Sequence, residues 1–287
     1  MAVLSAAEAA PRLHQEYRDG RLIPFLGAGY SKPLKLPDWS ELIGWMAARL
    51  GFEPELFLLH GRYEQLAEYF QLAGHDHFQK LVHEMTRRFD SEEADRARKT
   101  SRMHRALASL DWRTLYTTNY DSHVEGALQD AGKRVAVLAS FEDFQARREP
   151  GTHEVIKFHG TLSKPETIVL TESSYYHRIA LDAPVDQRLR ADLLSHSFLF
   201  MGYSFNDLNI RYIWYRMHQL RLQGQANSRR PSARRCFFAT FGAGPIQPEL
   251  LEQWNIDLIQ LDPADKEASV ADLLERIRRA PGARDDS

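Results

Sequence analysis

The chain has 287 residues, a length that suits one large domain or two small ones and allows a sizeable core. Hydrophobic residues make up 43% of it and charged residues 26%, which excludes a disordered chain and a fibrous repeat. Lys and Arg number 37 against 39 Asp and Glu, so the net charge is −2 and the composition carries no strong signal for direct nucleic-acid binding.

The predicted elements start with a buried strand and continue into a helical block. Residues 22–26 form a short apolar run that stops at a Gly-Ala-Gly turn, which is typical of a buried strand. From Trp39 to about Leu110 the apolar residues recur at helical spacing, and no strand pattern interrupts them. Because a simple strand–helix–strand unit has one helix there, we expect residues 40–110 to be an inserted helical subdomain beside a sheet.

Short apolar runs return after Leu110 and predict further strands, with helical patterns between several of them. The strand runs are residues 114–117, 134–138, 155–158, 168–170, 198–201, 236–239 and 258–261. The helical patterns include residues 124–128, 210–220 and 270–277. This alternation predicts an α/β fold in which a parallel sheet carries helices on both faces. Residues 281–287 are expected to form a flexible tail.

A glycine turn follows the first predicted strand. In an open parallel sheet, ligands bind at the carboxyl ends of the strands, so motifs at these ends are candidate sites. The two glycines of Gly27-Ala28-Gly29-Tyr30-Ser31 let the backbone turn tightly and approach a phosphate. Lys32 stands where the dinucleotide fingerprint has its third glycine, and no P-loop pattern is present. An ordinary strand-to-helix turn is therefore an equal alternative.

Polar residues follow two later strands. In Thr117-Thr118-Asn119-Tyr120-Asp121, Asn119 offers both an amide donor and a carbonyl acceptor, although strand-end amides often satisfy only loop groups. Asp121 has an alternative role as the cap of the next helix. His159, before Gly160, is placed to act as a base near neutral pH, with a hydrogen-bonded loop histidine as the alternative. A weaker fourth feature is Gly202-Tyr203-Ser204, whose small and hydroxyl groups suit a ribose or phosphate.

Cysteine content and apolar segments bear on the location of the protein. Cys236 is the only cysteine, so neither an intrachain disulfide nor a four-thiolate zinc site can form, and no zinc is expected. No stretch reaches the about 18 apolar residues that a membrane span needs. Residues 1–11 carry Glu8 and no basic region, so we expect no cleaved signal peptide and a cytoplasmic protein without a membrane partner.

Taken together, these motifs resemble the core of the sirtuin family. The family's Gly-Ala-Gly-x-Ser turn matches Gly27–Ser31, and its Pro-Asp-aromatic loop matches Pro37-Asp38-Trp39. Its Thr-x-Asn-x-Asp motif matches Thr117–Asp121. Its His-Gly pair matches His159-Gly160, and its Gly-x-Ser turn matches Gly202–Ser204. All of them occur in the family's order, within about residues 22–207. The resemblance implies a Rossmann-like fold, a single sirtuin-like domain over residues 1–287, NAD binding and usually a homo-oligomer.

Departures from the family pattern point to one branch of it. Deacylating sirtuins carry a four-cysteine zinc module after the histidine, whereas this chain has Cys236 alone, and Ser40 replaces an arginine that usually follows the Pro-Asp-aromatic loop. These features are similar to the zinc-less sirtuin-like domains of bacterial anti-phage defence systems, which destroy NAD. The resemblance also suggests a separate activator or sensor subunit, such as a HerA-type ATPase or a prokaryotic Argonaute.

The resemblance implies that NAD is a substrate, cleaved between nicotinamide and ribose. Asn119 would order the ribose or the attacking water, and His159 would take a proton from a ribose hydroxyl or from water. Backbone and hydroxyl groups of Gly27–Ser31 and Ser204 would hold the pyrophosphate and riboses, while Asp38 and Asp121 would line the nicotinamide pocket. The expected NAD-binding residues are Gly27, Ala28, Gly29, Tyr30, Ser31, Asp38, Trp39, Thr118, Asp121, Gly202, Tyr203 and Ser204.

Three other functions use parts of the same pattern. A non-catalytic module that senses NAD or ADP-ribose and gates a partner protein would need the same turns and release no product. An NAD-dependent protein deacylase is disfavoured by the missing zinc cysteines. A nuclease is disfavoured because the chain lacks a convincing carboxylate–metal pattern.

Overall fold

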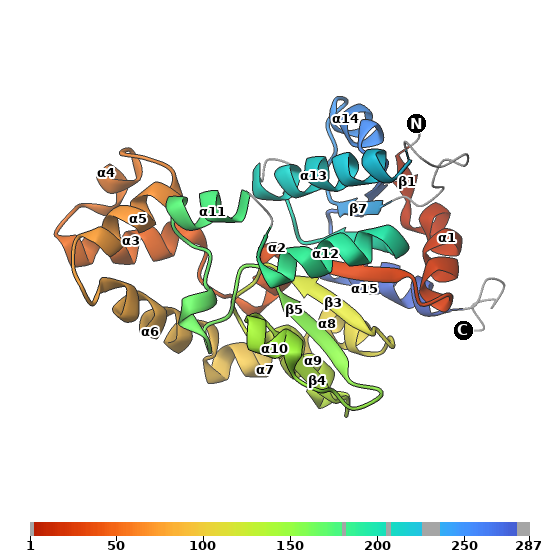
Figure 1. The fold of residues 1–287 in the computed structure, drawn as a ribbon, viewed down its shortest axis with the longest axis horizontal. Coiled ribbons are helices and arrows are strands. Elements are labelled where there is room, and N and C mark those ends of the chain that lie inside the picture. Colours follow the sequence, from red (N-terminus) through yellow and green to blue (C-terminus); the bar gives the residue numbers. More distant parts are fainter. Residues whose placement is uncertain (1–2, 180–181, 205–207, 226–235, 280–287) are drawn as a thin grey trace.

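The structure is a computed structural model that describes residues 3–179, 182–204, 208–225 and 236–279 (Figure 1). The expected tail at residues 281–287 lies outside this part. The strands are β1 (Leu4–Ser5), β2 (Leu22–Leu26), β3 (Thr114–Thr117), β4 (Val135–Leu138), β5 (His153–Lys157), β6 (Ser197–Met201), β7 (Cys236–Thr240) and β8 (Ile256–Gln260). The helices are α1 (Ala6–Arg18), α2 (Ala28–Ser31), α3 (Trp39–Leu50), α4 (Pro54–Leu58), α5 (Tyr63–Leu72), α6 (His77–Phe89), α7 (Glu92–Thr100), α8 (Arg102–Ala108), α9 (His123–Asp130), α10 (Phe141–Gln145), α11 (Glu172–Ile179), α12 (Pro184–Ser195), α13 (Leu208–Gln225), α14 (Gln247–Gln253) and α15 (Lys266–Arg278), with 3-10 turns η1 (Lys32–Leu34) and η2 (Pro165–Thr167).

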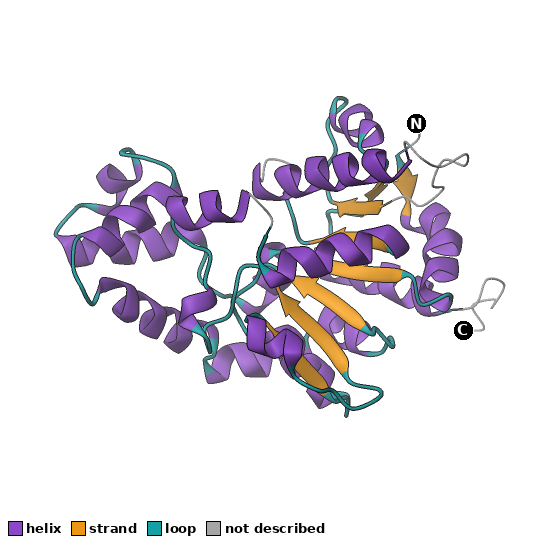
Figure 2. Cartoon of the chain, viewed as in Figure 1, coloured by secondary structure: helices purple, strands orange, loops and turns teal. Residues whose placement is uncertain are grey.

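The described strands form one parallel sheet, which confirms the predicted α/β fold and its Rossmann-like character. The strand order is β1-β8-β7-β6-β2-β3-β5-β4, and every neighbouring pair is parallel (Figure 2). From β2 the chain moves to β3 on one side, and it later places β6 on the other side of β2. Strand β2 therefore lies where the direction of the chain through the sheet reverses, and ligand crevices of open α/β sheets form at such points.

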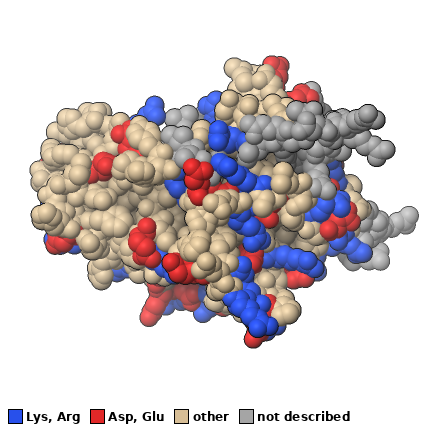
Figure 3. Space-filling view, in the orientation of Figure 1, with Lys and Arg blue, Asp and Glu red and all other residues tan. Residues whose placement is uncertain are grey.

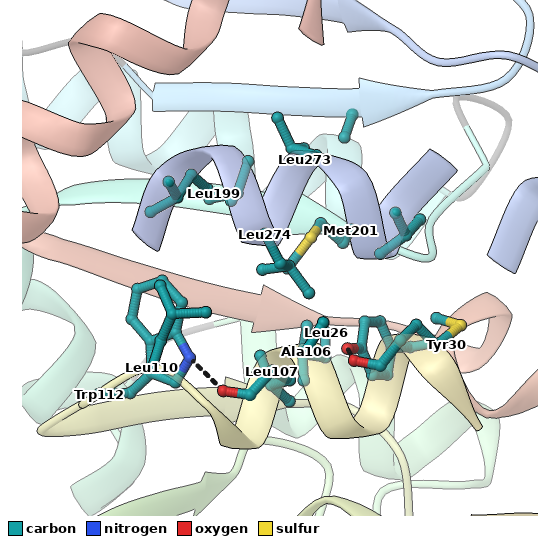
Figure 4. Packing of buried hydrophobic residues seen from close by; sticks show 14 of the residues in the cluster. Leu26, Tyr30, Ala106, Leu107, Leu110, Trp112, Leu199, Met201, Leu273 and Leu274 are labelled. Carbon is teal, nitrogen blue, oxygen red and sulfur yellow. Dashed lines mark hydrogen bonds between the residues drawn. The ribbon is translucent and has the colours of Figure 1, made fainter. Parts of the chain in front are cut away.

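Alternate residues of the central strands point to opposite faces of the sheet. In β2, Leu22 and Leu26 belong to one buried cluster, whereas Ile23 and Phe25 belong to the other. Helices α1, α8, α9 and α15 cover the first face, and α12, α13 and α14 cover the second. Figure 4 shows the packing on the first face, where the buried indole of Trp112 donates a hydrogen bond to the carbonyl of Leu107 at 2.9 Å. Helices on both faces were predicted, and this packing confirms them.

Helices occupy the predicted helical segment, and they contribute to two different hydrophobic clusters. Helices α3 to α6 bury a cluster of their own that includes Met46, Phe70 and Met85. In Figure 1 they form the orange lobe at the left, beyond the end of the sheet. Helix α8 packs instead on the sheet, through Met103 and Leu107. The helical segment therefore forms both a separate lobe and part of the cover of the sheet.

Two elements differ from the sequence prediction. Residues 168–170 follow η2 as a loop and form no strand, because Ile168 and Leu170 pack into the cluster of the helical lobe. A short apolar run that fills a helical core has the same hydrophobicity as a buried strand. Strand β1 was not predicted. It has two residues and pairs with the end of β8, so it is too short to show a periodic pattern.

Charged side chains are distributed unequally between the part of the surface over the sheet and the part over the helical lobe. On the face drawn in Figure 3, Lys and Arg side chains gather over the half that holds the sheet, with Asp and Glu among them. Few charges appear on that face over the lobe of α3, α4 and α5. In the part of the chain that the structure describes, no helix is long and apolar enough to cross a bilayer.

Candidate active site

Four motifs lie at one edge of the sheet. Strands β6, β2, β3 and β5 are neighbours in that order, with Leu26 paired to Met201 on one side and to Thr117 on the other, and Thr117 paired to Lys157. The motif residues that follow these strand ends within two positions are Gly202, Gly27, Asn119 and His159. Because neighbouring strands lie about 5 Å apart, the register brings these motifs close together at the carboxyl end of the sheet.

A buried hydrogen-bond network joins the glycine turn to the Asn-Asp motif. The Asn119 side-chain amide donates to the carbonyl of Gly27 at 3.1 Å and to Ser31 Oγ at 2.9 Å. Ser31 Oγ in turn donates to Asp121 Oδ2 at 2.9 Å. All three side chains are buried. These bonds use both amide hydrogens of Asn119, and among the described residues no hydrogen bond engages its carbonyl oxygen, which can accept one from a ligand or water.

Asp121 links the start of α9 to this network. Its Oδ1 accepts a hydrogen bond from the backbone N–H of His123 at 3.1 Å, although the N-cap of α9 is Ser122 and not Asp121, as the sequence alternative had it. Its Oδ2 accepts from Ser31 inside the network. The carboxylate therefore orients both the helix and the Ser31 hydroxyl.

The glycine turn packs directly against the Gly202 turn. Gly27 N–H donates to the carbonyl of Met201 and Gly29 N–H to that of Gly202, each at 2.9 Å. A Cβ on Gly29 would lie only 2.8 Å from the Gly202 oxygen, so this approach requires glycine. Two N–H groups that were expected to face a phosphate are thus engaged within the protein. That of Ala28 has no backbone acceptor among the described residues.

Alanine at position 202 is expected to destabilise the protein strongly. Gly202 has φ of +79°, and a Cβ there would lie 2.5 Å from Tyr30 N. Gly132 has a similar φ of +77° with open space around it, so Gly132→Ala measures the conformational cost alone, about 1–2 kcal/mol. Urea unfolding should show a clearly larger loss for Gly202→Ala. Equal losses would mean that the two turns separate without cost.

Thr118, in the loop after β3, and Tyr203, in the loop after β6, both hydrogen-bond to the end of β2. Thr118 Oγ1 and Tyr203 OH lie 3.0 Å apart, and Tyr203 OH donates to the carbonyl of Leu26 at 2.9 Å. Thr118 N–H donates to the same carbonyl at 3.0 Å. Ser204 follows directly and is exposed. The structure therefore brings Thr118 and Tyr203 to the glycine turn, and their contact with NAD stays a prediction.

His159 lies in a largely apolar, aromatic setting. Its ring packs edge-on against Tyr175 at 5.4 Å between centroids and lies beside Phe158. Burial, with a smaller contribution from the positive charge of Arg178, lowers the pKa of His159 to about 3. The imidazole is therefore neutral at physiological pH and can accept a proton. Its basicity is weaker than that of the near-neutral base expected from the sequence, because burial removes the water that stabilises the imidazolium.

Asp38 and Trp39 are placed apart from this network by their contacts. Asp38 is exposed and is the N-cap of α3, in a capping box with Glu41. Trp39 stacks on Tyr63 at 5.9 Å, within the helical lobe. Among the described residues, no hydrogen bond or ring contact joins either side chain to Asn119. Their expected place in a nicotinamide pocket remains a prediction.

Three residues near the site were not singled out from the sequence. Lys157 is the last residue of β5 and is fully buried, and Tyr175 and Arg178 come from α11. Arg178 donates to the carbonyl of Phe158 at 2.8 Å, with its guanidinium 4.6 Å from that ring. A lysine at the end of an apolar strand, before His-Gly, was a visible signal. The hydroxyl-rich sequence of α11 offered none.

A cavity of about 680 Å³ opens next to these loops. Its walls come from α7, α9 and residues 161–163, and Tyr120 and Ser122 line it on either side of Asp121. Within the described ranges, no three His, Cys, Asp or Glu side chains are grouped to hold a metal ion. The cavity therefore lies beside the Asn119 network, with Glu125 among its lining residues.

The buried imidazole of His104 should make the fold sensitive to acid. It packs edge-on against Tyr30, and burial lowers its pKa to about 4, with smaller effects from nearby charges including Asp121. In the unfolded chain a histidine titrates near 6.5, so the unfolded state binds a proton first as pH falls. The free energy of unfolding should drop by up to about 3 kcal/mol between pH 6.5 and 4. Urea titrations across this range should show a shallower pH dependence for His104→Leu. An equal slope would contradict the prediction.

With this geometry in view, comparisons with known proteins identify the class of fold. The chain matches the SIR2-like domain family over residues 113–259, half of its length. The chain therefore belongs to the SIR2-like domain family, which confirms the resemblance seen in the sequence motifs.

Several characterised relatives are similar over most of this chain. It is 31% identical over 221 residues to the NAD(+) hydrolase ThsA of Acinetobacter baumannii. The aligned region covers 76% of this chain and 43% of that protein. It is 30% identical over 260 residues to the NAD(+) hydrolase ThsA of Cytobacillus dafuensis, covering 90% and 48%. It is 24% identical over 290 residues to the defense-associated sirtuin 2 of Bacillus subtilis, covering 94% and 27%. The chain spans less than half the length of these relatives.

Proposed function

We propose that this chain is an NAD hydrolase that cleaves the bond between nicotinamide and ribose, depleting cellular NAD in anti-phage defence. One observation carries the proposal: four adjacent parallel strands deliver the glycine turns, Asn119 and His159 to the same edge of the sheet. The names of the hydrolase relatives support the reaction, and that of the sirtuin relative supports the role in defence.

The chemistry requires positioning more than a strong nucleophile. The nicotinamide of NAD is already cationic, so its departure leaves positive charge on the ribose in the transition state. Interactions that hold the ribose and stabilise this charge lower the barrier. In our proposal the carbonyl oxygen of Asn119 orders a ribose hydroxyl or the attacking water. Its amide group is fixed by Gly27 and Ser31, so the side chain is held in place before substrate binds.

His159 completes this proposal as the proton acceptor. A neutral imidazole can take a proton from a ribose hydroxyl or from water as the new bond forms. Its pKa of about 3 means that the ring is unprotonated across the physiological range, although it is a weaker base than an exposed histidine. The edge-on contact with Tyr175 and the nearby Arg178 leave the ring few orientations.

Product analysis tests the proposal and separates it from the alternatives. The purified protein is incubated with NAD, alone and with a protein encoded next to it, and nicotinamide and ADP-ribose are separated by chromatography. Equimolar release of both supports the hydrolase. Tight binding of ADP-ribose with no release, in either arm, would replace it by a sensing module. Removal of an acyl group from a lysine peptide at the expense of NAD would replace it by a deacylase.

The same proposal extends to organisation and control. We propose that residues 1–287 form a single SIR2-like domain, with residues 40–110 as its helical insertion. Uncontrolled NAD loss would harm the host cell, so we also propose restraint through a homo-oligomer or a separate activator, such as a HerA-type ATPase or a prokaryotic Argonaute. A single cysteine suits a reducing compartment, and we place the reaction in the cytoplasm.

A further inference from the structure

A buried lysine connects the two loops that carry the proposed catalytic residues. Lys157, at the end of β5, has a side chain with 0% exposure. Its ammonium donates to the main-chain carbonyl of Asp121 and lies 2.8 Å from Glu125 Oε1. Lys157 precedes His159 by two positions, and Asp121 follows Asn119 by two. The contact therefore links the two loops just beyond the ends of their strands.

The regular sheet hydrogen bonds do not reach this far. Between β3 and β5 the ladder continues to the bond from Phe158 N–H to the carbonyl of Thr117, at 2.7 Å. Farther along, Tyr120 OH donates to the carbonyl of Val169 at 2.6 Å, and Val169 N–H donates to the carbonyl of His159 at 2.9 Å. The Lys157 ammonium contacts the carbonyl of the residue that follows Tyr120, beyond the last sheet bond along the Asn-Asp loop. It is thus placed to hold the Asn-Asp loop against the strand that leads to His159.

The ion pair is not well built for stability alone. Glu125 has a side chain with 7% exposure, and its Oε2 is buried without a hydrogen bond to any described residue. Burying two charges carries a desolvation penalty, and well-packed apolar residues of similar size are often as stabilising or more so. An unsatisfied carboxylate oxygen adds to this penalty. The pair therefore calls for an explanation other than stability.

We propose that Lys157 is a positioning residue: its ammonium, whose charge Glu125 balances, fixes the Asp121 carbonyl and so sets Asn119 in register with His159. This inference rests on the proposed NAD hydrolase function. Positioning contributes mainly to the chemical step, since a displacement of about 1 Å can reduce the rate about 10²-fold. The loss should appear in kcat rather than in KM.

Two variants separate positioning from stability. Lys157→Met/Glu125→Leu removes both charges and keeps the volume, so its melting temperature should equal or exceed that of the wild type, while kcat for NAD falls about 10- to 10²-fold. Glu125→Gln keeps the ammonium on the Asp121 carbonyl but leaves it without an opposite charge. It should melt at a lower temperature, yet keep kcat within about threefold of the wild type.

Of the two variants, the double variant should therefore have the higher melting temperature and the lower kcat. If Lys157 had a purely structural role, the variant with the higher melting temperature would also have the higher kcat. A double variant with wild-type kcat would overturn the proposal. Amide hydrogen exchange gives a readout that does not need turnover: residues 119–123 should exchange at least about tenfold faster in the double variant, with β7 and β8 unchanged. If the wild type consumes no NAD, the proposed function fails, while unchanged exchange at residues 119–123 overturns the anchoring separately.

Discussion

Replacing Asn119 with alanine is expected to reduce NAD consumption by about 10²-fold or more while the protein remains folded. The side chain lies between the glycine turn and Asp121, and its amide group is already held by Gly27 and Ser31. The substitution removes the carbonyl that would order the ribose or water, and it also frees the Ser31 hydroxyl. Single-turnover measurement of nicotinamide release at saturating NAD would isolate the chemical step.

A neighbouring serine supplies the matched control for this variant. Ser122 lies three positions later and is exposed, and its hydroxyl donates to Asp90 at 3.0 Å, away from the network. Ser122→Ala should retain activity close to that of the wild type. If Asn119→Ala released nicotinamide as fast as Ser122→Ala, Asn119 would have no part in the reaction.

The second large effect is expected at His159. His159→Ala should also lose about 10²-fold or more in NAD consumption, because it removes the group that accepts the proton. The fold should survive, since the described structure gives the His159 ring only packing contacts with Phe158 and Tyr175. Circular dichroism and urea unfolding should show native structure, and the chromatographic assay should show little nicotinamide.

Strand β5, which leads to His159, contains a second histidine that is equally buried and can serve as a control. His153 begins β5 and, like His159, is 9% exposed, and its Nδ1 hydrogen-bonds to the carbonyl of Trp112. It lies at the amino end of the strand, away from the proposed site. His153→Ala should lose stability but retain activity per folded molecule. A wild-type rate for His159→Ala would rule out its catalytic role, and an equal loss in both variants would point to damage to the fold.

The amino-acid sequence by itself was enough to locate most of the sheet. The runs at residues 22–26 and 114–117 coincide with β2 and β3, because strands covered on both faces are mostly apolar. It also located the motifs. Since parallel strands end at the same edge, residues just after those runs could be expected together before their order in the sheet was known.

Only the tertiary structure could decide how these strand ends meet. The order β6-β2-β3-β5 sets which motifs are neighbours, and strand order depends on contacts between segments far apart in the chain. Hydrophobicity at residues 168–170 predicted burial correctly but could not show that they pack against helices. The ion-pair partner of Lys157 was equally hidden, because Glu125 lies on another element 32 positions earlier. Local patterns report whether a side chain is buried, whereas its neighbours depend on how distant segments pack.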